Sequence, residues 1–207
     1  MIEALAEAAG RDVSRETFAR LEAFAALIEE ENERQNLVAR STLAALWDRH
    51  LIDSAQLLRY APQGVSRWLD VGSGAGLPGI VLAILSGEPI LLVEPRRLRA
   101  DFLRRCVNQL DLLDAEVACS KVEQVTGSFD VVTARAVATA DRLLAMTLRL
   151  SHPGTRWVLP KGRSGAKELA DVRRAWQGRF RAEVSITDPE AVVLVAEDVK
   201  PRGGTSR

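Results

Sequence analysis

The chain has 207 residues, 47% hydrophobic and 27% charged, a composition typical of a soluble globular protein. It excludes a membrane span, because no apolar run approaches the ~20 residues that a span needs, and the N-terminus lacks the features of a signal peptide. The two cysteines, Cys106 and Cys119, have no metal-ligand spacing and form no disulfide framework. We therefore expect a cytoplasmic α/β protein without a metal site.

The net charge is zero, but it is unevenly distributed along the chain. Residues 1–60 hold 7 basic and 11 acidic residues, whereas residues 95–175 hold 15 basic and 9 acidic residues. A basic middle segment can form a patch for a polyanion such as nucleic acid. The alternative is that arginine supplies solvated faces throughout, and charge alone favours this second interpretation.

The first 60 residues are predicted to be helical, because apolar residues recur at spacings of three and four. Ser14 can cap one helix, and Ser41 or Thr42 begins another. A Pro-Gln-Gly turn at residues 62–64 marks the end of this part. We therefore expect an N-terminal helical extension over residues 1–62.

Strands and helices alternate from residue 67 onward. The expected strands are 67–71, 89–94, 115–119, 129–133, 154–159, 180–187 and 191–197. The expected helices are 79–86, 96–110, 138–150 and 164–177. This alternation predicts a doubly wound, mostly parallel seven-stranded sheet with an antiparallel end. The Rossmann-like domain then covers residues 63–200, and residues 201–207 form a flexible tail.

A glycine-rich stretch follows the first strand of this domain. A short apolar run after Arg67 ends in Asp70, and glycines follow at positions 72, 74, 76 and 79. Glycine adopts positive φ and lets a ligand approach the backbone, and the helix that follows offers unpaired N–H groups at its start. The stretch predicts a nucleotide-type pocket at the carboxyl end of the first strand.

Two acidic residues indicate which cofactor this pocket holds. Gly74, Gly76 and Gly79 match the spacing of dinucleotide-binding loops, but the Asp70 carboxylate would repel a pyrophosphate. S-adenosylmethionine carries a sulfonium and an ammonium, and Glu94, after the second strand, is placed to bind ribose hydroxyls. Together these residues resemble the cofactor site of class I S-adenosylmethionine-dependent methyltransferases. The alternative is a structural turn followed by a surface acid.

Further motifs, spread over nearly the whole chain, carry a more specific resemblance. They are residues 32–37, 49–54, 69–79 and 133–136, with a Lys161-Gly162 pair after the fifth strand. In these motifs the chain resembles the bacterial guanine-N7 methyltransferases of small-subunit (16S) ribosomal RNA, also called the glucose-inhibited division protein B family. One departure is that Glu31 and Val38 stand where the family often has Trp and Thr.

The resemblance implies the activity, its cofactor S-adenosylmethionine, its partner 16S ribosomal RNA and a set of site residues. The residues implied for the cofactor are Gly72, Leu77, Val122, Glu123 and Arg135, beside Asp70, Gly74, Gly76 and Glu94. The residues expected at the RNA are Asn36, Lys161 and Arg135. For Lys161 the alternatives are a phosphate contact and a plain surface lysine, and for Val122 and Glu123 the alternative is a surface turn.

The expected mechanism needs no general base, because guanine N7 has a free lone pair and no proton to lose. The motif Thr-Ala-Arg-Ala at 133–136 replaces the Asn/Asp-Pro-Pro-aromatic motif of many amine methylases. Neither cysteine has the Pro-Cys setting of carbon methylases. We expect Arg135 to position the reactants; a structural salt bridge is the alternative.

His50 and Asp53 lie one helical turn apart and can face the same way. They suggest either acid–base chemistry or a packing role, and we favour the second, in which they tie the N-terminal helices to the loop over the cofactor. The four tryptophans are expected to pack in the core rather than stack on bases. They are Trp47, Trp68, Trp157 and Trp176.

Three other functions stay open at this point. The chain can be a methyltransferase for another RNA, a protein or a small molecule. It can be a nicotinamide-dependent oxidoreductase, or an RNA-binding module without catalysis. We expect a monomer that does not associate with membranes.

Overall fold

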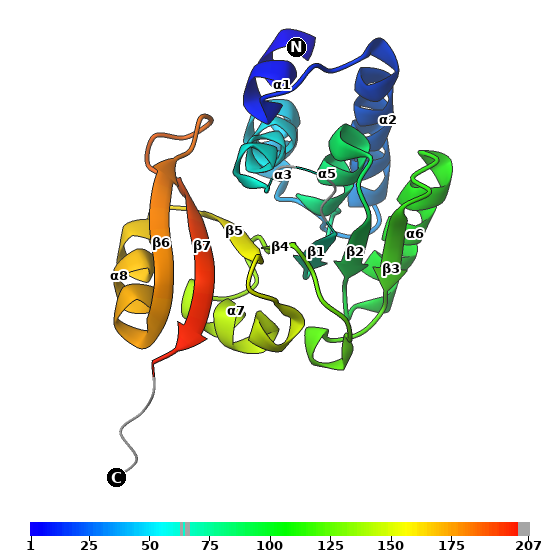
Figure 1. Cartoon of the computed structure of the whole chain (residues 1–207). Coiled ribbons are helices and arrows are strands. Elements are labelled where there is room, and N and C mark those ends of the chain that lie inside the picture. The colour runs from blue at the N-terminus through cyan, green and yellow to red at the C-terminus, as the bar shows by residue number, and fades with distance from the viewer. Residues whose placement is uncertain (63, 65–66, 203–207) are drawn as a thin grey trace.

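A seven-stranded sheet forms the centre of the computed structural model, which describes residues 1–62, 64 and 67–202 (Figure 1). Its strands, in chain order, are β1 (Trp68–Val71), β2 (Ile90–Val93), β3 (Ala115–Ala118), β4 (Val131–Thr133), β5 (Arg156–Lys161), β6 (Trp176–Val184) and β7 (Val192–Pro201). They lie in the order β3-β2-β1-β4-β5-β7-β6, with β1 to β5 parallel and β7 antiparallel to both neighbours. The expected α/β fold with an antiparallel end is confirmed.

Helices cover both faces of this sheet. The helical segments are α1 (Ile2–Ala9), α2 (Arg15–Asn32), α3 (Arg40–Leu43), η1 (Trp47–Ile52), α4 (Asp53–Ala55), η2 (Gln56–Tyr60), α5 (Gly79–Ser86), α6 (Arg97–Gln109), η3 (Val122–Gln124), α7 (Ala140–Thr147), η4 (Leu148–Leu150) and α8 (Gly165–Ala175). The N-terminal segments pack with α5 and α6 on one face, and α7 and α8 pack on the other. Because β1 and β4 are neighbours whose helices lie on opposite faces, their carboxyl ends form a crevice for a ligand.

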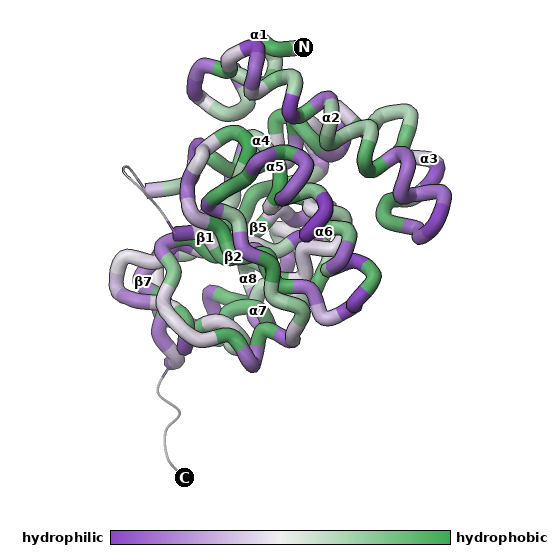
Figure 2. Tube along the Cα trace, turned by 90° about the vertical axis from the view of Figure 1, so that its right-hand side faces the viewer, coloured by the Kyte–Doolittle hydropathy of each residue, from purple (hydrophilic) through white to green (hydrophobic). Residues whose placement is uncertain are grey.

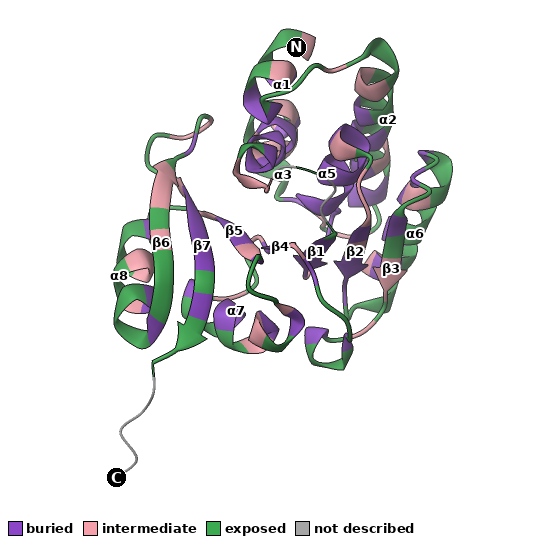
Figure 3. Ribbon diagram, viewed as in Figure 1, coloured by how far each residue is buried: buried purple, intermediate pink, exposed green. Residues whose placement is uncertain are grey.

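Alternating side chains of the strands supply the two cores. Trp68, Val131 and Val158 point into the core shared with the N-terminal helices, and Leu69 and Val132 point to the opposite face. The apolar α5 and β2 appear mainly green in Figure 2, and β1 and β2 appear mainly buried in Figure 3. Continuous apolar strands are typical of parallel sheets covered on both faces.

In the N-terminal part, the structure confirms the first expected helix and differs from the second. Ser14 caps α2 by accepting a hydrogen bond from the Thr17 amide at 3.1 Å. The single helix expected from Ser41 or Thr42 is wrong, since the chain forms α3, a π-helical η1, α4 and η2 instead. The Ser54 hydroxyl donates to the His50 carbonyl at 2.6 Å, a bond that distorts a helical turn.

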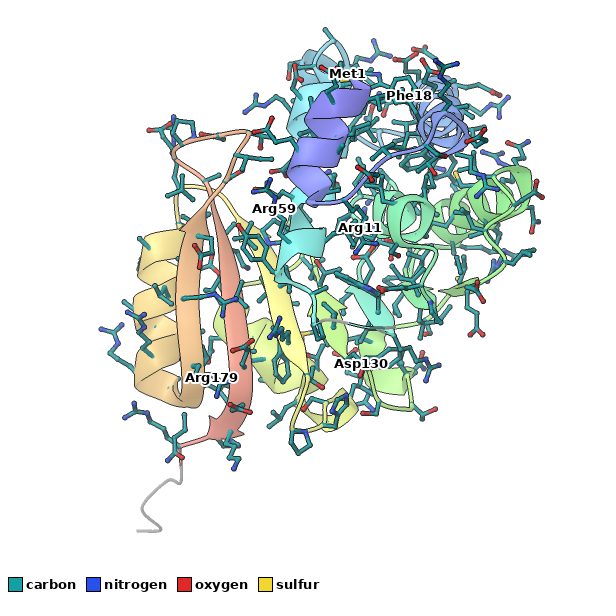
Figure 4. The ribbon with its side chains drawn as sticks, turned by 45° about the horizontal axis from the view of Figure 1, so that its top comes forward. Met1, Arg11, Phe18, Arg59, Asp130 and Arg179 are labelled. Carbon is teal, nitrogen blue, oxygen red and sulfur yellow. The ribbon has the colours of Figure 1, made fainter. Side chains whose placement is uncertain are left out.

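The N-terminal helices are also fastened to one another and to the sheet. Arg59, labelled in Figure 4, donates from Nε to the Ala8 carbonyl at 2.8 Å and also bonds the Glu7 carbonyl. One continuous core joins α1 and α2 to the sheet. The division after residue 62 stays a prediction, and Gln63 of the expected turn lies outside the described residues.

The C-terminal end is more ordered than expected. β6 begins at Trp176, four residues early, because the Trp176 indole is buried and donates to Asp141 at 2.7 Å. β7 includes Pro201, and Arg202 donates to the Arg173 carbonyl at 2.9 Å, so these two residues are not part of a flexible tail. Residues 203–207 lie outside the described part.

Three of the four tryptophans are core residues, as expected. Trp68, Trp157 and Trp176 are buried, and the half-buried Trp47 packs against Phe18 with ring centroids 5.4 Å apart.

Over the described ranges 1–62, 64 and 67–202, the structure contains no helix with the length and apolarity to cross a membrane.

Candidate functional site

A cavity of about 550 Å³ opens at the carboxyl ends of β1, β2 and β4. Its walls come from four loops that follow parallel strands: the glycine loop, the loop after β2, the turn around η3 and the loop after β4. Most of the residues implied for the cofactor line it, namely Gly72, Gly74, Leu77, Glu94, Val122, Glu123 and Arg135. The topology therefore gathers at one edge residues that are far apart in the sequence.

Gly72 lets the loops after β1 and β4 close on each other. Its φ of 70° lies in the left-handed region. A Cβ atom on Gly72 would lie 2.5 Å from Val137 Cγ2, which no side chain tolerates. This glycine therefore sets how closely the wall formed by Val137 approaches the glycine loop.

The Glu94 carboxylate is held in the cavity wall by two backbone amides. Its Oε2 accepts from the Gly74 amide at 3.0 Å, and its Oε1 accepts from the Arg96 amide at 2.9 Å. Each oxygen of an ionised carboxylate has two lone pairs, so acceptor capacity remains on both. Glu94 thus fixes the glycine loop and still presents acceptors to a ligand.

Asp70 lies behind the glycine loop rather than in the cavity wall. Its side chain is 0% exposed, and Oδ2 accepts from the Gly79 amide at 3.2 Å. Burial raises the pKa of Asp70 to about 7, although hydrogen bonds from Ser73 and Gly79 act in the opposite direction. The expectation that this carboxylate faces the ligand is wrong, because Asp70 lies within the buried strand β1 and its side chain turns under the start of α5. Gly76 also packs inward, against Ile80 and Phe24.

Arg135 connects the loop after β4 to the N-terminal helices. Its Nη1 lies 3.1 Å from Nδ1 of His50 and 3.8 Å from Oδ2 of Asp53. The neighbouring Ala136 has a φ of 57°, a left-handed conformation that non-glycine residues rarely adopt and that is found at functional sites. The expected packing role of His50 and Asp53 therefore agrees with their contacts.

The His50 ring is neutral in this arrangement. Burial, followed by the positive charges of Arg135 and Arg49, lowers the pKa of His50 to about 4. Since a guanidinium can only donate, we assign Nδ1 as the acceptor from Arg135 and Nε2–H as the donor to Thr42 Oγ1 at 3.1 Å. The ring thus orients Arg135 without carrying charge.

A search of known sequences and structures shows where this chain belongs. The family of rRNA small subunit methyltransferase G matches residues 17–191.

The chain belongs to this family.

Members of the rRNA small subunit methyltransferase G family are S-adenosylmethionine-dependent methyltransferases, so the chain is a methyltransferase. A relative from Rhizorhabdus wittichii, named ribosomal RNA small subunit methyltransferase G, is 49% identical over 97% of this chain and 94% of its own. Relatives of the same name from Sphingopyxis alaskensis (49% identity, 88% of this chain, 79% of theirs) and Zymomonas mobilis (42%, 92% and 90%) agree.

Solved structures show the same fold at low sequence identity. An S-adenosylmethionine-dependent methyltransferase from Aquifex aeolicus superposes with a TM-score of 0.58 at 14% identity, over 74% of this chain and 93% of its own. A TehB-like methyltransferase from Corynebacterium glutamicum gives 0.57 at 21% identity, over 84% and 98%. The predicted methyltransferase fold is thereby confirmed.

Two residues expected at the RNA, Lys161 and Asn36, do not line the cofactor cavity. The Lys161 ammonium is 3.0 Å from Glu168 and donates to the Ala138 carbonyl at 2.8 Å, with 8% of the side chain exposed. It is therefore paired with Glu168 rather than a plain surface lysine, and its expected phosphate contact stays a prediction. Asn36 is exposed and lines neither this cavity nor its neighbour, and its carbonyl accepts from Arg99 at 3.2 Å.

Several cavity residues were missed by sequence reasoning. Four cationic side chains line the cofactor cavity: Arg96, Arg99, Lys121 and Arg142. The basic balance of residues 95–175 is the signal that could have indicated them. Ser185 and Thr187, which bond Asp53 from the connection between β6 and β7, have no local signal at all.

Proposed function

We propose that this chain transfers the methyl group of S-adenosylmethionine to N7 of a guanine in the 16S ribosomal RNA of the small subunit. The observation that carries the proposal is the cavity at the ends of β1, β2 and β4, with the Glu94 carboxylate in its wall and Arg135 at its edge. Family membership supplies the substrate class, since the relatives are named for the RNA of the small subunit. Such an enzyme works where ribosomal subunits are made, so we propose the cytoplasm.

The residues present fit S-adenosylmethionine. The glycine loop leaves room that a Cβ atom on Gly72 would close, and Glu94 keeps acceptors free for the hydroxyls of a ribose. Val122 and Glu123, in the η3 turn, are at the cavity wall on the side of β3, where an adenine edge can be recognised. Glu94 and Glu123 place two carboxylates among the cationic side chains of this wall.

The chemistry that the cofactor supplies is an electrophilic methyl group on a sulfonium. The chain's own residues then need to align the acceptor and exclude competing water. No proton has to leave guanine N7, and the cavity is consistent with that, because the neutral His50 already uses Nδ1 to accept from Arg135. Arg135 keeps further N–H groups, which can donate to guanine O6.

The basic rim supports an RNA substrate. Arg96, Arg99, Lys121 and Arg142 all line the cavity. Positive side chains around a concave site attract a phosphate backbone, so methylation should weaken as salt concentration rises. An uncharged or cationic small substrate would show no such dependence.

The test is a methylation assay with the purified chain, labelled S-adenosylmethionine and small-subunit ribosomal RNA, both naked and in particles. We expect label in one 7-methylguanosine, identified by nucleoside mass analysis and located by cleavage of the RNA at the methylated base. Label in another RNA, a protein or a metabolite, with none in 16S ribosomal RNA, would refute the proposal.

A further inference from the structure

We propose that a second cavity, on the other side of Arg135 from the cofactor cavity, holds the acceptor base after it has left the RNA stack, and that Asp53 selects guanine there. This inference rests on the proposed function and adds to it the subsite and the residue that recognises the base.

The position of the second cavity fits an acceptor. Its volume is about 720 Å³, within the range of pockets that enclose small ligands. It shares Leu37, Arg135 and Ala136 with the cofactor cavity, so the two spaces meet at these residues. Enzymes that modify a base inside an RNA or DNA take that base out of its stack into such a pocket. A base bound here would lie next to the methyl donor.

The two oxygens of the Asp53 carboxylate have different partners. Oδ1 accepts from Gln56 Nε2 at 2.7 Å, Thr187 Oγ1 at 2.9 Å and Ser185 Oγ at 3.4 Å. Within the described residues, no hydrogen bond goes to Oδ2, which lies 3.8 Å from Arg135 Nη1. The side chain is 19% exposed, and Asp53 is in the wall of the second cavity. Oδ2 is thus a positioned acceptor with free lone pairs.

Asp53 is held rigidly by a segment that is distant in sequence. Gln56 also accepts from the Ile186 amide at 3.1 Å, which fastens the connection between β6 and β7 to the N-terminal helices. An acceptor fixed in this way loses little freedom on binding, so it can discriminate strongly between ligands.

Two of the other charged groups in this cavity are already paired with each other, whereas Arg49 and Asp188 also line it. Lys161 and Glu168 form an ion pair, and Glu168 also accepts from the Ala140 amide at 2.7 Å and from Ser164 at 2.8 Å. Asp53 Oδ2 and the spare N–H groups of Arg135 thus place an acceptor and a donor side by side in this cavity, with Arg135 in the wall shared with the cofactor cavity.

This donor–acceptor pair matches guanine. Guanine presents O6, an acceptor, beside N1–H and the N2 amino group, which are donors, so O6 suits Arg135 and the donors suit Asp53. Adenine presents an amino group and an unprotonated N1 in the corresponding places. Its amino donor would face the Arg135 donors, and its N1 acceptor would face the Asp53 acceptor. Because N7 is next to O6 on the purine, a base held through Arg135 has N7 on the side of the shared wall.

The Asp53→Asn variant tests this inference with little change in shape. Gln56 and Thr187 donate to the position of Oδ1, so the amide oxygen stays there and the NH₂ group replaces Oδ2. A donor then faces the guanine donors. The assay compares methylation of small-subunit RNA that carries guanosine or inosine at the target position, because inosine lacks the N2 amino group.

We expect the wild-type chain to prefer guanosine by roughly tenfold in kcat/KM, the value of one such hydrogen bond. In Asp53→Asn this ratio should fall to about one or below. The matched control is Thr187→Val, which removes one anchor of Oδ1 and keeps the carboxylate. It should lower the rate on both RNAs and retain the ratio, and all three proteins should bind S-adenosylmethionine equally in calorimetry.

The outcomes separate this inference from the function on which it rests. A wild-type chain that methylates guanosine and inosine RNA equally, or an Asp53→Asn variant that keeps the wild-type ratio, overturns the inference alone. A wild-type chain that methylates no RNA overturns the proposed function and this inference together. Loss of the guanosine preference in Asp53→Asn, together with its retention in Thr187→Val, supports the inference.

Discussion

Arg135 donates a hydrogen bond to Nδ1 of His50 over 3.1 Å, although the two residues are 85 positions apart in the chain. The bond joins the loop after β4 to the π-helical segment η1 and places the guanidinium at the wall between the two cavities. Because imidazole accepts at Nδ1 only when it is neutral there, the protonation state of His50 is linked to the position of Arg135.

Replacing Arg135 should stop methylation and leave the fold intact. We expect Arg135→Ala to lower kcat by about 100-fold or more, the scale of a lost positioning contact. Arg135→Lys is the matched control, which keeps the charge but not the planar set of donors, so it should recover only part of the activity. Rates come from labelled methyl transfer, and circular dichroism reports the fold. Full activity in Arg135→Ala would remove this residue from the site.

Replacing Glu94 should weaken cofactor binding. We expect Glu94→Ala to cost about 1–3 kcal/mol in the binding of S-adenosylmethionine, measured by calorimetry, because charged hydrogen bonds are lost. Glu94→Gln keeps one acceptor for the Gly74 amide and should show a smaller loss. Unchanged affinity in both variants would contradict a role for this carboxylate at the cofactor.

The lowered pKa of His50 predicts how the stability of the folded chain changes at acidic pH. Its pKa is lowered to about 4 in the folded chain, so between about pH 6.5 and pH 4 the unfolded chain binds more protons. This residue therefore makes the folded state less stable as the pH falls through that window. In urea titrations from pH 7 to pH 4, His50→Gln should lose less stability than the wild type. Parallel curves for the two proteins would disprove this assignment.

Asp70 changes the pH dependence of stability in the opposite direction to His50. Its pKa is raised to about 7 in the folded chain, so between about pH 4 and pH 7 the folded chain binds more protons, and this residue reduces stability as the pH rises. Asp70→Asn keeps an acceptor for the Gly79 amide and does not titrate. Its free energy of unfolding relative to wild type should therefore increase from pH 5 to pH 8. A constant difference over this range would count against the prediction.

Gly72 and Val137 offer a test of the cavity wall. Gly72→Ala places a Cβ atom 2.5 Å from Val137 Cγ2 at a φ of 70°, so we expect weaker cofactor binding and a lower melting temperature. The double variant with Val137→Ala removes the clash but not the backbone strain. It should recover part of both losses. If Val137→Ala restores nothing, the two loops are not in contact as described.

Much of the fold could be predicted from local patterns. The alternation of apolar strands with helices depends on periodicities within short segments, and the structure confirms it from β1 to β7. The main errors lie where a tertiary contact replaces the local preference. Trp176 begins a strand, and its indole donates to Asp141. The helix expected after Ser41 is interrupted at Ala44 and Ala45, and its π-helical part carries His50, which is bound by Arg135.

The sequence by itself determined that the first strand carries an acid near its end and is followed by glycines, and that another acid, Glu94, follows the second strand, since both features depend on neighbouring residues. Only the tertiary structure decided what each acid does: Glu94 lies in the cavity wall, and Asp70 is buried under the loop. It also decided that Lys161 is paired with Glu168 and that Asp53 is held by Thr187, 134 positions away. Such contacts arise from packing between distant segments, which leaves no periodic signal in the chain.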